Sequence, residues 1–357
     1  MPLRQVKHQI LPRKRFQLRC LQVCVCLLLL TQGFKAIAEI VEDPENNALS
    51  SSAQKVSGEA WLERMAVAMQ TQSYRGVFVY SRGDTFSSMK VIHRYKDGED
   101  REKLVQLDGE MGEILRTGDE VVCVLPGNRV VSLEQSIPSG PFAGAFARTL
   151  MPKKDHYFIA VEGEGRIAGH QAIKVAVTAK DVYRYNYVLW LEKYSGLLLK
   201  SVLTNADGDV LEQFHYTFLE LADNISDEEL APNNMGDVYS HESLPSIQAS
   251  SDWPAKMEWR IDWLPDGFMP VNKGLSGQGV VSSSNVQVFT DGLASFSVFI
   301  EKPGKGNMPE GVSVIGATVA YAHRLTWKNH NYMVTVVGEV PIAAAMRIAE
   351  RVVPDTY

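Results

Sequence analysis

The stretch from Gly163 to Ala168 has the spacing of a dinucleotide-binding loop, Gly-x-Gly-x-x-Ala. In such a loop the glycines open a helix, because the pyrophosphate binds the free N–H groups of the helix N-terminus. Residues 172–179 follow here instead, and their side chains alternate in the manner of a β-strand. We therefore predict that the match is accidental and that the glycines lie in a turn.

The other residues that could take part in catalysis or metal binding do not occur at the spacings of known catalytic or metal-binding motifs either. Seven histidines follow the first 38 residues, and none has the paired spacing of a zinc site. His93 and His215 fall in predicted strands, where packed or surface histidines are expected. The sequence contains no Gly-x-Ser-x-Gly elbow and no Gly-x-x-x-x-Gly-Lys loop. We predict a binding protein without metal or cofactor; the alternative is a secreted hydrolase whose catalytic groups converge from distant positions.

Residues 1–38 have the features of a secretory signal peptide. They carry seven Lys and Arg and no acidic residue, with an apolar run from Cys20 to Leu30 and small residues at Ala36 and Ala38. The run is about half the length needed to span a bilayer, and an uncleaved anchor is the alternative. We predict export and cleavage after Ala38. Cys123 is then the one remaining cysteine, and we interpret it as a buried small hydrophobe.

The chain becomes strongly acidic once this leader is removed. Its 36 basic and 42 acidic residues give a net charge of −6, and loss of the seven basic leader residues lowers the charge to −13. Nucleic-acid binding needs a clustered basic surface, so we exclude a nucleic-acid partner. The length of 357 residues and the hydrophobic content of 45% are typical of two globular domains.

Residues 39–222 are predicted to form a large antiparallel β domain. After a polar lead-in, Ser57 is a plausible N-cap for a helix whose apolar residues recur at helical spacing. From Tyr74 the period changes to two, and turns such as Asp97-Gly98 separate the strands. A second short helix is expected at 139–150. The apolar face of the first helix consists of Trp61, Leu62, Met65 and Met69.

The concave face of this sheet is predicted to be apolar, which leaves two interpretations open. The helices either fill the inside as an ordinary core, or they leave a cleft that can hold an acyl chain. The alternation around Tyr216 places the aromatic residues of that strand on one face. The candidates for lining a cleft, with an ordinary core position as the alternative for each, are Phe78, Trp190, Phe214 and Phe218.

A linker and a smaller domain are predicted to follow. Residues 223–252 are acidic and then rich in Ser, Pro and Asn, which is typical of a linker. Residues 253–357 contain a hairpin around Asp291-Gly292 and a closing helix with Pro341 in its first turn, so we predict a small α+β domain. The expected apolar stripe of that helix consists of Ile342, Ala345, Met346, Ala349 and Val352.

Aromatic residues of the smaller domain are the candidates for contacting a protein partner, because the energetically dominant residues of interfaces are usually buried aromatics and Arg. For each of them a position in the core is the alternative. The fold class that we predict for the whole chain is α+β and predominantly antiparallel β. The partner-binding candidates are Trp263, Phe268, Phe289 and Phe296.

An ordered set of motifs resembles the MucB/RseB family of negative regulators of envelope-stress sigma factors. No single motif is decisive, but together they cover nearly all of the chain after the leader. They are Trp61-Leu62-Glu63-Arg64-Met65, Tyr74-Arg75-Gly76-Val77-Phe78-Val79-Tyr80, Tyr183-Arg184-Tyr185 with Leu189-Trp190-Leu191, Gly196-Leu197-Leu198-Leu199-Lys200, Leu211-Glu212-Gln213-Phe214, Trp263-Leu264-Pro265-Asp266-Gly267-Phe268, Phe289-Thr290-Asp291-Gly292-Leu293-Ala294-Ser295-Phe296, and Gly338-Glu339-Val340-Pro341.

This resemblance implies a function in the periplasm. The large domain would be a LolA-like half-barrel wrapped on helices, and the smaller domain would bind the periplasmic segment of a MucA/RseA-type membrane anti-sigma factor. Binding would shield that factor from regulated proteolysis. Lipid, lipopolysaccharide or lipoprotein acyl groups would release it, and the protein would form homo-oligomers. The alternative is a periplasmic carrier of lipid or lipoprotein, although a simple carrier would not need a second domain with its own core.

Overall fold

The computed structural model describes residues 56–109, 112–118, 120–125, 129–133, 155–233, 259–270, 286–302 and 308–354. The described residues from 56 onward belong to one compact unit. The leader with its cleavage after Ala38 and the helix expected at 139–150 lie outside the described residues. None of the helices within the described ranges is long and apolar enough to cross a bilayer.

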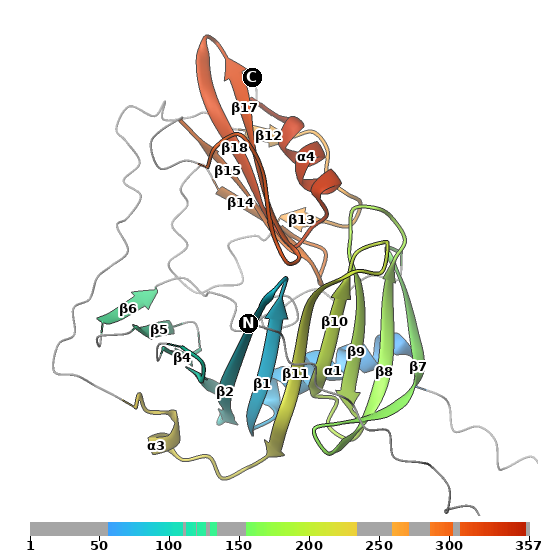
Figure 1. The fold of residues 1–357 in the computed structure, drawn as a ribbon, viewed down its shortest axis with the longest axis vertical. Helices are drawn as coiled ribbons and strands as arrows, with labels where there is room; N and C mark the ends of the chain where they lie inside the picture. The colour runs from blue at the N-terminus through green and yellow to red at the C-terminus, as the bar shows by residue number, and fades with distance from the viewer. Residues whose placement is uncertain are drawn as a thin grey trace, which may run out of the picture. The chain divides into compact units, whose positions relative to one another are not determined.

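Eleven antiparallel strands form one sheet in the order β6-β5-β4-β3-β2-β1-β11-β10-β9-β8-β7 (Figure 1). Two meanders, β1 to β6 and β7 to β11, are joined where β11 pairs with β1. β6 and β7 are the two edges, so the sheet is not closed into a barrel. The strands are β1 (Tyr74–Arg82), β2 (Thr85–Lys96), β3 (Glu99–Gln106), β4 (Glu113–Thr117), β5 (Glu120–Leu125), β6 (Arg129–Leu133), β7 (Tyr157–Ile167), β8 (His170–Ala179), β9 (Asn186–Glu192), β10 (Leu198–Thr204) and β11 (Val210–Leu221).

Helix α1 (Gly58–Thr71) lies against one face of this sheet, beside β7 and β8 (Figure 1). As predicted, the Ser57 side chain caps it by accepting a hydrogen bond from the Ala60 N–H. The predicted apolar face is buried against the sheet, except that Met69 is only partly buried. Each large apolar side chain buried in this way contributes about 1.5–3 kcal/mol. The buried residues of the helix are Gly58, Trp61, Leu62, Met65 and Ala68.

A β-bulge in β11 changes which side chains face the interior. Val77 of β1 pairs with Phe218 and Phe78 pairs with Tyr216, so Thr217 is the extra residue. An extra residue reverses the alternation beyond it. Phe214 and Tyr216 are therefore buried, whereas Phe218 is 52% exposed. The prediction that one face carries all three aromatic residues is wrong for Phe218.

The two glycines of the nucleotide-loop spacing do not lie in a turn, as we had predicted. Gly163 and Gly165 both fall within β7 and pair with β8, and the turn comes afterwards at Ala168-Gly169. The element that follows is strand β8 and not a helix. The stretch therefore lacks the helix N-terminus that would hold a pyrophosphate.

A six-stranded antiparallel sheet has the order β13-β14-β15-β18-β17-β16, and β12 and β19 form a separate pair. Helix α4 (Ile342–Glu350) follows Pro341 and packs on β17 and β18. Its small residues Ala344 and Ala345 are buried, whereas Ile342 and Met346 are exposed, so the predicted stripe is rotated. The strands are β12 (Trp259–Ile261), β13 (Met269–Pro270), β14 (Val286–Thr290), β15 (Ser295–Glu301), β16 (Gly311–Ile315), β17 (Thr318–Trp327), β18 (His330–Gly338) and β19 (Val352–Pro354).

Candidate functional site

A buried ion pair joins the two sheets. The side chain of Arg184, just before β9, is fully buried, and its Nε donates to Oδ2 of Asp291 at 2.8 Å. Asp291 lies in the turn between β14 and β15 and is itself 1% exposed. The remaining guanidinium nitrogens donate to the Asp181 carboxylate and to the Asp266 carbonyl. A charge is tolerated away from water only when it is paired and its hydrogen bonds are satisfied.

Aromatic rings enclose this ion pair. The Arg184 guanidinium carbon lies 5.1 Å from the ring centre of Phe268 and 5.8 Å from that of Tyr157. The Tyr157 hydroxyl donates to Asp291 Oδ2 at 2.8 Å. Burial, followed by the charge of Asp291, raises the pKa of Tyr157 well above its usual value. The hydroxyl therefore stays protonated and remains a donor at any physiological pH.

A second contact between the sheets centres on Glu212 of β11, whose side chain is 2% exposed. Its Oε1 accepts from the Ala317 N–H at 2.9 Å, and its Oε2 accepts from the Tyr80 hydroxyl. Arg82 lies 3.6 Å from the same carboxylate and donates to the Ile315 carbonyl at 3.2 Å. Gly316 sits between them with a φ of +59°, and an added Cβ would lie 2.6 Å from Arg82 Cγ. Close approach of the β16–β17 turn therefore requires glycine here.

The first part of the predicted linker packs on the eleven-stranded sheet. This segment, residues 223–233, is named the acidic arm below. Its helix α3 (Asp227–Leu230) has a capping box in which Ser226 and Glu229 bond each other's backbone. Leu230 is buried in a small apolar cluster with Ile92 of β2. Residues 223–233 of the predicted linker are therefore folded against the eleven-stranded sheet.

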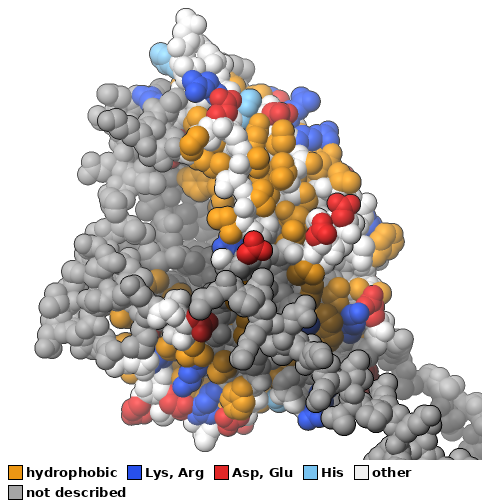
Figure 2. Space-filling view, in the orientation of Figure 1, with side chains coloured by type: hydrophobic (Ala, Val, Ile, Leu, Met, Phe, Trp, Pro, Cys, Tyr) orange, Lys and Arg blue, Asp and Glu red, His pale blue; other side chains and the backbone are white. Residues whose placement is uncertain are grey.

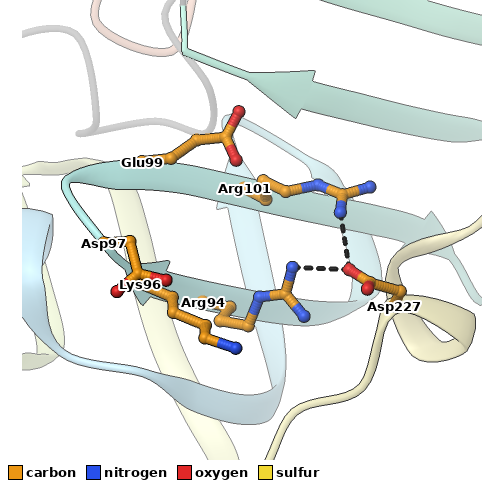
Figure 3. Close-up of a pocket in the computed structure, with 6 residues that line it drawn as sticks. All are labelled: Arg94, Lys96, Asp97, Glu99, Arg101 and Asp227. Carbon is orange, nitrogen blue, oxygen red and sulfur yellow. Dashed lines mark hydrogen bonds and ion pairs between the residues drawn. The ribbon is translucent and has the colours of Figure 1, made fainter.

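Charge complementarity holds the acidic arm to β1, β2 and β3. Glu229 accepts two hydrogen bonds from Arg75, at 2.6 and 2.7 Å. Arg94 and Arg101 both donate to Oδ1 of Asp227, at 2.6 and 2.7 Å (Figure 3). The surface pocket at this point is lined only by charged side chains, so it is unsuited to an acyl chain. Its lining residues are Arg94, Lys96, Asp97, Glu99, Arg101 and Asp227.

We expect acid to loosen the acidic arm. Hydrogen bonding to Arg75 lowers the pKa of Glu229 to about 2 from its usual 4.5. The stabilisation by this carboxylate is therefore fully present above pH 4.5 and is lost as the pH falls toward 2. Amide exchange of residues 223–233 measures the change, and at pH 7 Glu229→Gln is expected to reduce protection roughly two- to fivefold, as for other partly exposed ion pairs. Asp223→Asn, an exposed acid of the same arm, is the matched control; equal effects of the two variants would contradict the prediction.

The described residues contain no group of His, Cys, Asp and Glu that could hold a metal ion. Cys123 is partly buried, and burial raises the pKa of its thiol, which makes it a poor nucleophile. The arrangement of charged groups thus favours structural contacts between elements over reaction chemistry.

Both parts of the chain match known proteins. A family model for the MucB/RseB N-terminal domain matches residues 57–234, and one for the MucB/RseB C-terminal domain matches residues 254–353. The sigma factor AlgU regulatory protein MucB of Pseudomonas aeruginosa is 33% identical over 305 residues, covering 85% of this chain and 92% of the relative. The chain belongs to the MucB/RseB family.

Other relatives agree with this assignment. The sigma-E factor regulatory protein RseB of Escherichia coli K12 is 29% identical over 310 residues, covering 85% of this chain and 92% of the relative. The complex structure of Pseudomonas aeruginosa MucA/MucB aligns with a TM-score of 0.64 and 31% identity, covering 84% of this chain and 99% of that chain. A structure of MucB in complex with MucA(peri) aligns with a TM-score of 0.62 and 31% identity, covering 84% of this chain and 100% of that chain. MucB/RseB proteins are regulatory binding proteins and not enzymes.

The four partner-binding candidates occupy different positions in this MucB/RseB protein. The rings of Phe289 and Phe296 stack with their centres 5.2 Å apart in the core of the six-stranded sheet, and both side chains are almost fully buried. Phe268 is buried against Phe296 and covers Arg184. Trp263 is partly exposed, with the Arg347 guanidinium 4.0 Å from its ring centre. Of the four, only Trp263 is partly exposed, and its ring also packs 4.9 Å from that of Tyr183.

The four cleft candidates divide between the two faces of the eleven-stranded sheet. Phe78 and Phe214 are buried on the inner face, with ring centres 4.9 Å apart. Trp190 alternates with buried Leu189 and Leu191 and therefore lies on the outer face, as Phe218 does. The Trp190 ring is flanked by Lys200 and Lys174, whose Nζ atoms lie 4.8 and 5.7 Å from its centre.

Sequence reasoning missed the polar residues that join the sheets. Arg184 and Asp291 entered the sequence analysis only as members of MucB/RseB motifs and, for Asp291, as a turn residue. The one local feature that could have pointed to the ion pair is the position of this arginine between two tyrosines, Tyr183 and Tyr185. The pairing itself spans 107 residues and is invisible in a single sequence.

Proposed function

We propose that this chain is an exported negative regulator of an envelope-stress sigma factor. It would bind the periplasmic segment of a MucA/RseA-type membrane anti-sigma factor and shield it from regulated proteolysis. The observation that carries the proposal is the near full-length match to MucB structures, two of which contain MucA or its periplasmic part. The division of labour that we propose is a cleaved leader (1–38), a signal-sensing domain (39–222), a connection (223–252) and a partner-binding domain (253–357).

The six-stranded sheet supports the proposal with exposed apolar surface. Figure 2 shows apolar side chains gathered over the part of the visible face where β17, β18 and α4 lie in Figure 1. Contiguous exposed apolar surface with a polar rim is typical of a protein-binding region. Trp263 has Arg347 beside its ring. Tryptophan and arginine are among the residues that contribute most to the binding free energy of protein interfaces. The exposed large apolar residues of this part of the chain include Val312, Val314, Ile315, Ile342 and Met346.

Binding to the isolated periplasmic segment of the anti-sigma factor from the same genome tests the proposal. We expect saturable binding by the purified protein, and Trp263→Ala is expected to weaken it roughly tenfold or more, as for truncated interface tryptophans. The matched control is Trp190→Ala, a tryptophan on the outer face of the other sheet. Absence of binding by the unmodified protein would overturn the proposed function, and equal losses in both variants would overturn the role of Trp263.

Release by a lipid signal is the second part of the proposal. An acyl chain gains about 0.8 kcal/mol per buried methylene, so a few methylenes match the 1–3 kcal/mol typical of coupling between sites. The inner face of the eleven-stranded sheet is apolar, and its rings Phe78 and Phe214 are buried in the core, so an acyl chain would have to displace part of this packing. A labelled acyl probe that binds tightly but leaves the affinity for the anti-sigma segment unchanged would rule out this mechanism, because a ligand shifts an equilibrium only through differential affinity.

A further inference from the structure

Strand β16 is one edge of the six-stranded sheet, and among the described residues it pairs only with β17. Ile315 pairs with Thr318 across the two-residue turn that joins these strands. In such a hairpin the pairing alternates, so the N–H and C=O groups of Val312 and Val314 point away from β17. Both side chains are about half exposed, at 51% and 48%. Within the described part of the chain, this edge therefore presents unpaired backbone groups next to exposed apolar side chains.

Two other sheet edges have features that keep another strand away, as natural sheet edges usually do. β7, at the edge of the eleven-stranded sheet, contains a bulge and the charged residues Glu162, Glu164 and Arg166. β13, at the opposite edge of the six-stranded sheet, is two residues long and contains Pro270. From residue 311 to residue 318, in contrast, the sequence contains no charged residue and no proline. β16 therefore lacks the features that prevent the addition of a strand.

The apolar side chains at this edge lie on the same face of the sheet as α4. Val312 pairs with Tyr321 of β17, and Tyr321 pairs with Val336 of β18, so the three side chains share one face. Val336 belongs to the core that α4 completes. The helix leaves Ile342 and Met346 exposed above this face. A strand added to β16 would therefore place every second side chain on an apolar face.

The charges that act on Tyr321 come from two carboxylates. Burial, followed by the charges of Glu350 on α4 and of Glu310, raises the pKa of Tyr321. Arg324 lies 3.5 Å from Glu310 and neutralises it in part, whereas Glu350 is exposed. A second copy of the chain, paired edge to edge about a two-fold axis, would bring the same acids to the same face. Charge complementarity therefore favours a different chain, one that carries Lys or Arg.

Contacts with the eleven-stranded sheet hold the end of β16 in place. The Ile315 carbonyl accepts a hydrogen bond from Arg82 of β1 at 3.2 Å. The turn that follows is fixed by the Ala317 N–H, which donates to Glu212 of β11 at 2.9 Å. Because the strand is already ordered, a partner that pairs with it loses less binding free energy to ordering.

We propose that the edge of β16 binds an extended segment of the anti-sigma factor as an additional strand. The segment hydrogen-bonds to the backbone of Val312 and Val314 and places alternate apolar side chains on the face that α4 covers. A Lys or Arg of the segment lies near Glu350. In this mode of recognition the main-chain hydrogen bonds supply affinity and the alternate side chains supply specificity. The inference rests on the proposed function and adds the mode of binding at the partner-binding domain.

Backbone amide exchange of the purified protein, with and without the isolated periplasmic segment, tests this mode of binding. At saturation we expect exchange of the Val312 and Val314 N–H groups to slow roughly tenfold or more, because each gains a hydrogen bond. The Ser313 N–H already faces β17 and is expected to change little. Binding that leaves Val312 and Val314 unchanged would overturn the inference and leave the proposed function standing. Absence of binding would overturn both.

Val314→Pro removes one outward N–H group without removing a hydrogen bond to β17, and proline is tolerated at sheet edges. We expect this variant to bind the segment roughly tenfold more weakly, since it loses a main-chain hydrogen bond and the proline ring obstructs the added strand. Val314→Thr keeps the N–H group and the β-branched shape, so it is the matched control and is expected to change the affinity less than about threefold. Equal affinities of the two variants would overturn the inference.

Glu350→Gln tests the charge of the bound segment. We expect binding to weaken roughly two- to fivefold, as for other exposed ion pairs, and Glu63→Gln, which alters an exposed acid on α1, to leave it unchanged. Equal affinities of these two variants would overturn the assignment of a basic residue to the segment. Protection of Val312 and Val314 that rises with protein concentration in the absence of the segment would show that a second copy occupies the edge, and it would overturn the inference.

Discussion

Replacement of Arg184 by alanine is expected to lower the free energy of unfolding by roughly 3–5 kcal/mol, the usual cost of removing one partner from a buried ion pair. Asp291, 1% exposed, would then carry a buried charge without its counter-ion. The Tyr157 hydroxyl would still donate to it, but a neutral donor cannot replace a guanidinium. Urea denaturation followed by circular dichroism gives the change in free energy.

A double-mutant cycle separates the ion pair from the loss of packing. Arg184→Ala combined with Asp291→Ala is expected to lose less stability than the sum of the two single variants, because neither charge is then left unpaired. Arg347→Ala is the matched control, since that arginine is exposed and contacts Tyr183 and Trp263 at the surface. A loss below about 1 kcal/mol for Arg184→Ala would show that the pair does not hold the sheets together.

Phe214 and Phe218, on the same strand, are expected to respond very differently to truncation. Phe214→Ala removes a buried ring that packs 4.9 Å from both Phe78 and Tyr216, which typically costs 3–5 kcal/mol. Phe218→Ala removes a ring that is 52% exposed, and substitutions of this kind are usually within about 0.5 kcal/mol. Chemical denaturation of both variants compares them under one set of conditions. Equal losses would mean that the bulge at Thr217 does not form.

The contrast between Phe214 and Phe218 shows which features of the fold can be predicted from the sequence and which cannot. Strands, caps and tight turns depend on neighbouring residues, and Ser57, Asp97-Gly98 and the hairpin around Asp291-Gly292 lie where predicted. The face of the sheet on which the Phe218 side chain lies depends instead on how β11 pairs with β1, a strand about 140 residues earlier in the chain. Alternation alone carries no information about an extra residue in a distant pairing.

Other differences from prediction have the same origin. The acidic run after residue 222 resembles a linker in composition, and it packs on the sheet because β1 to β3 present Arg75, Arg94 and Arg101. α4 packs on β17 and β18 through Ala344, Ala345, Ile348 and Ala349, whereas Ile342 is exposed. In each case a residue's surroundings are set by tertiary contacts that the local pattern does not contain.

The pairing of β1 with β11 has a consequence for the order of folding. Tyr74 pairs with Leu221, so β1 cannot complete its pairing before β11 has been synthesised. During synthesis, which starts at the N-terminus, the edge of β1 that pairs with β11 therefore stays unpaired until residue 221 has been added. Long-range strand pairing of this kind slows folding and leaves an edge open to wrong partners. We expect the nascent protein to depend on chaperones that cover this edge during synthesis.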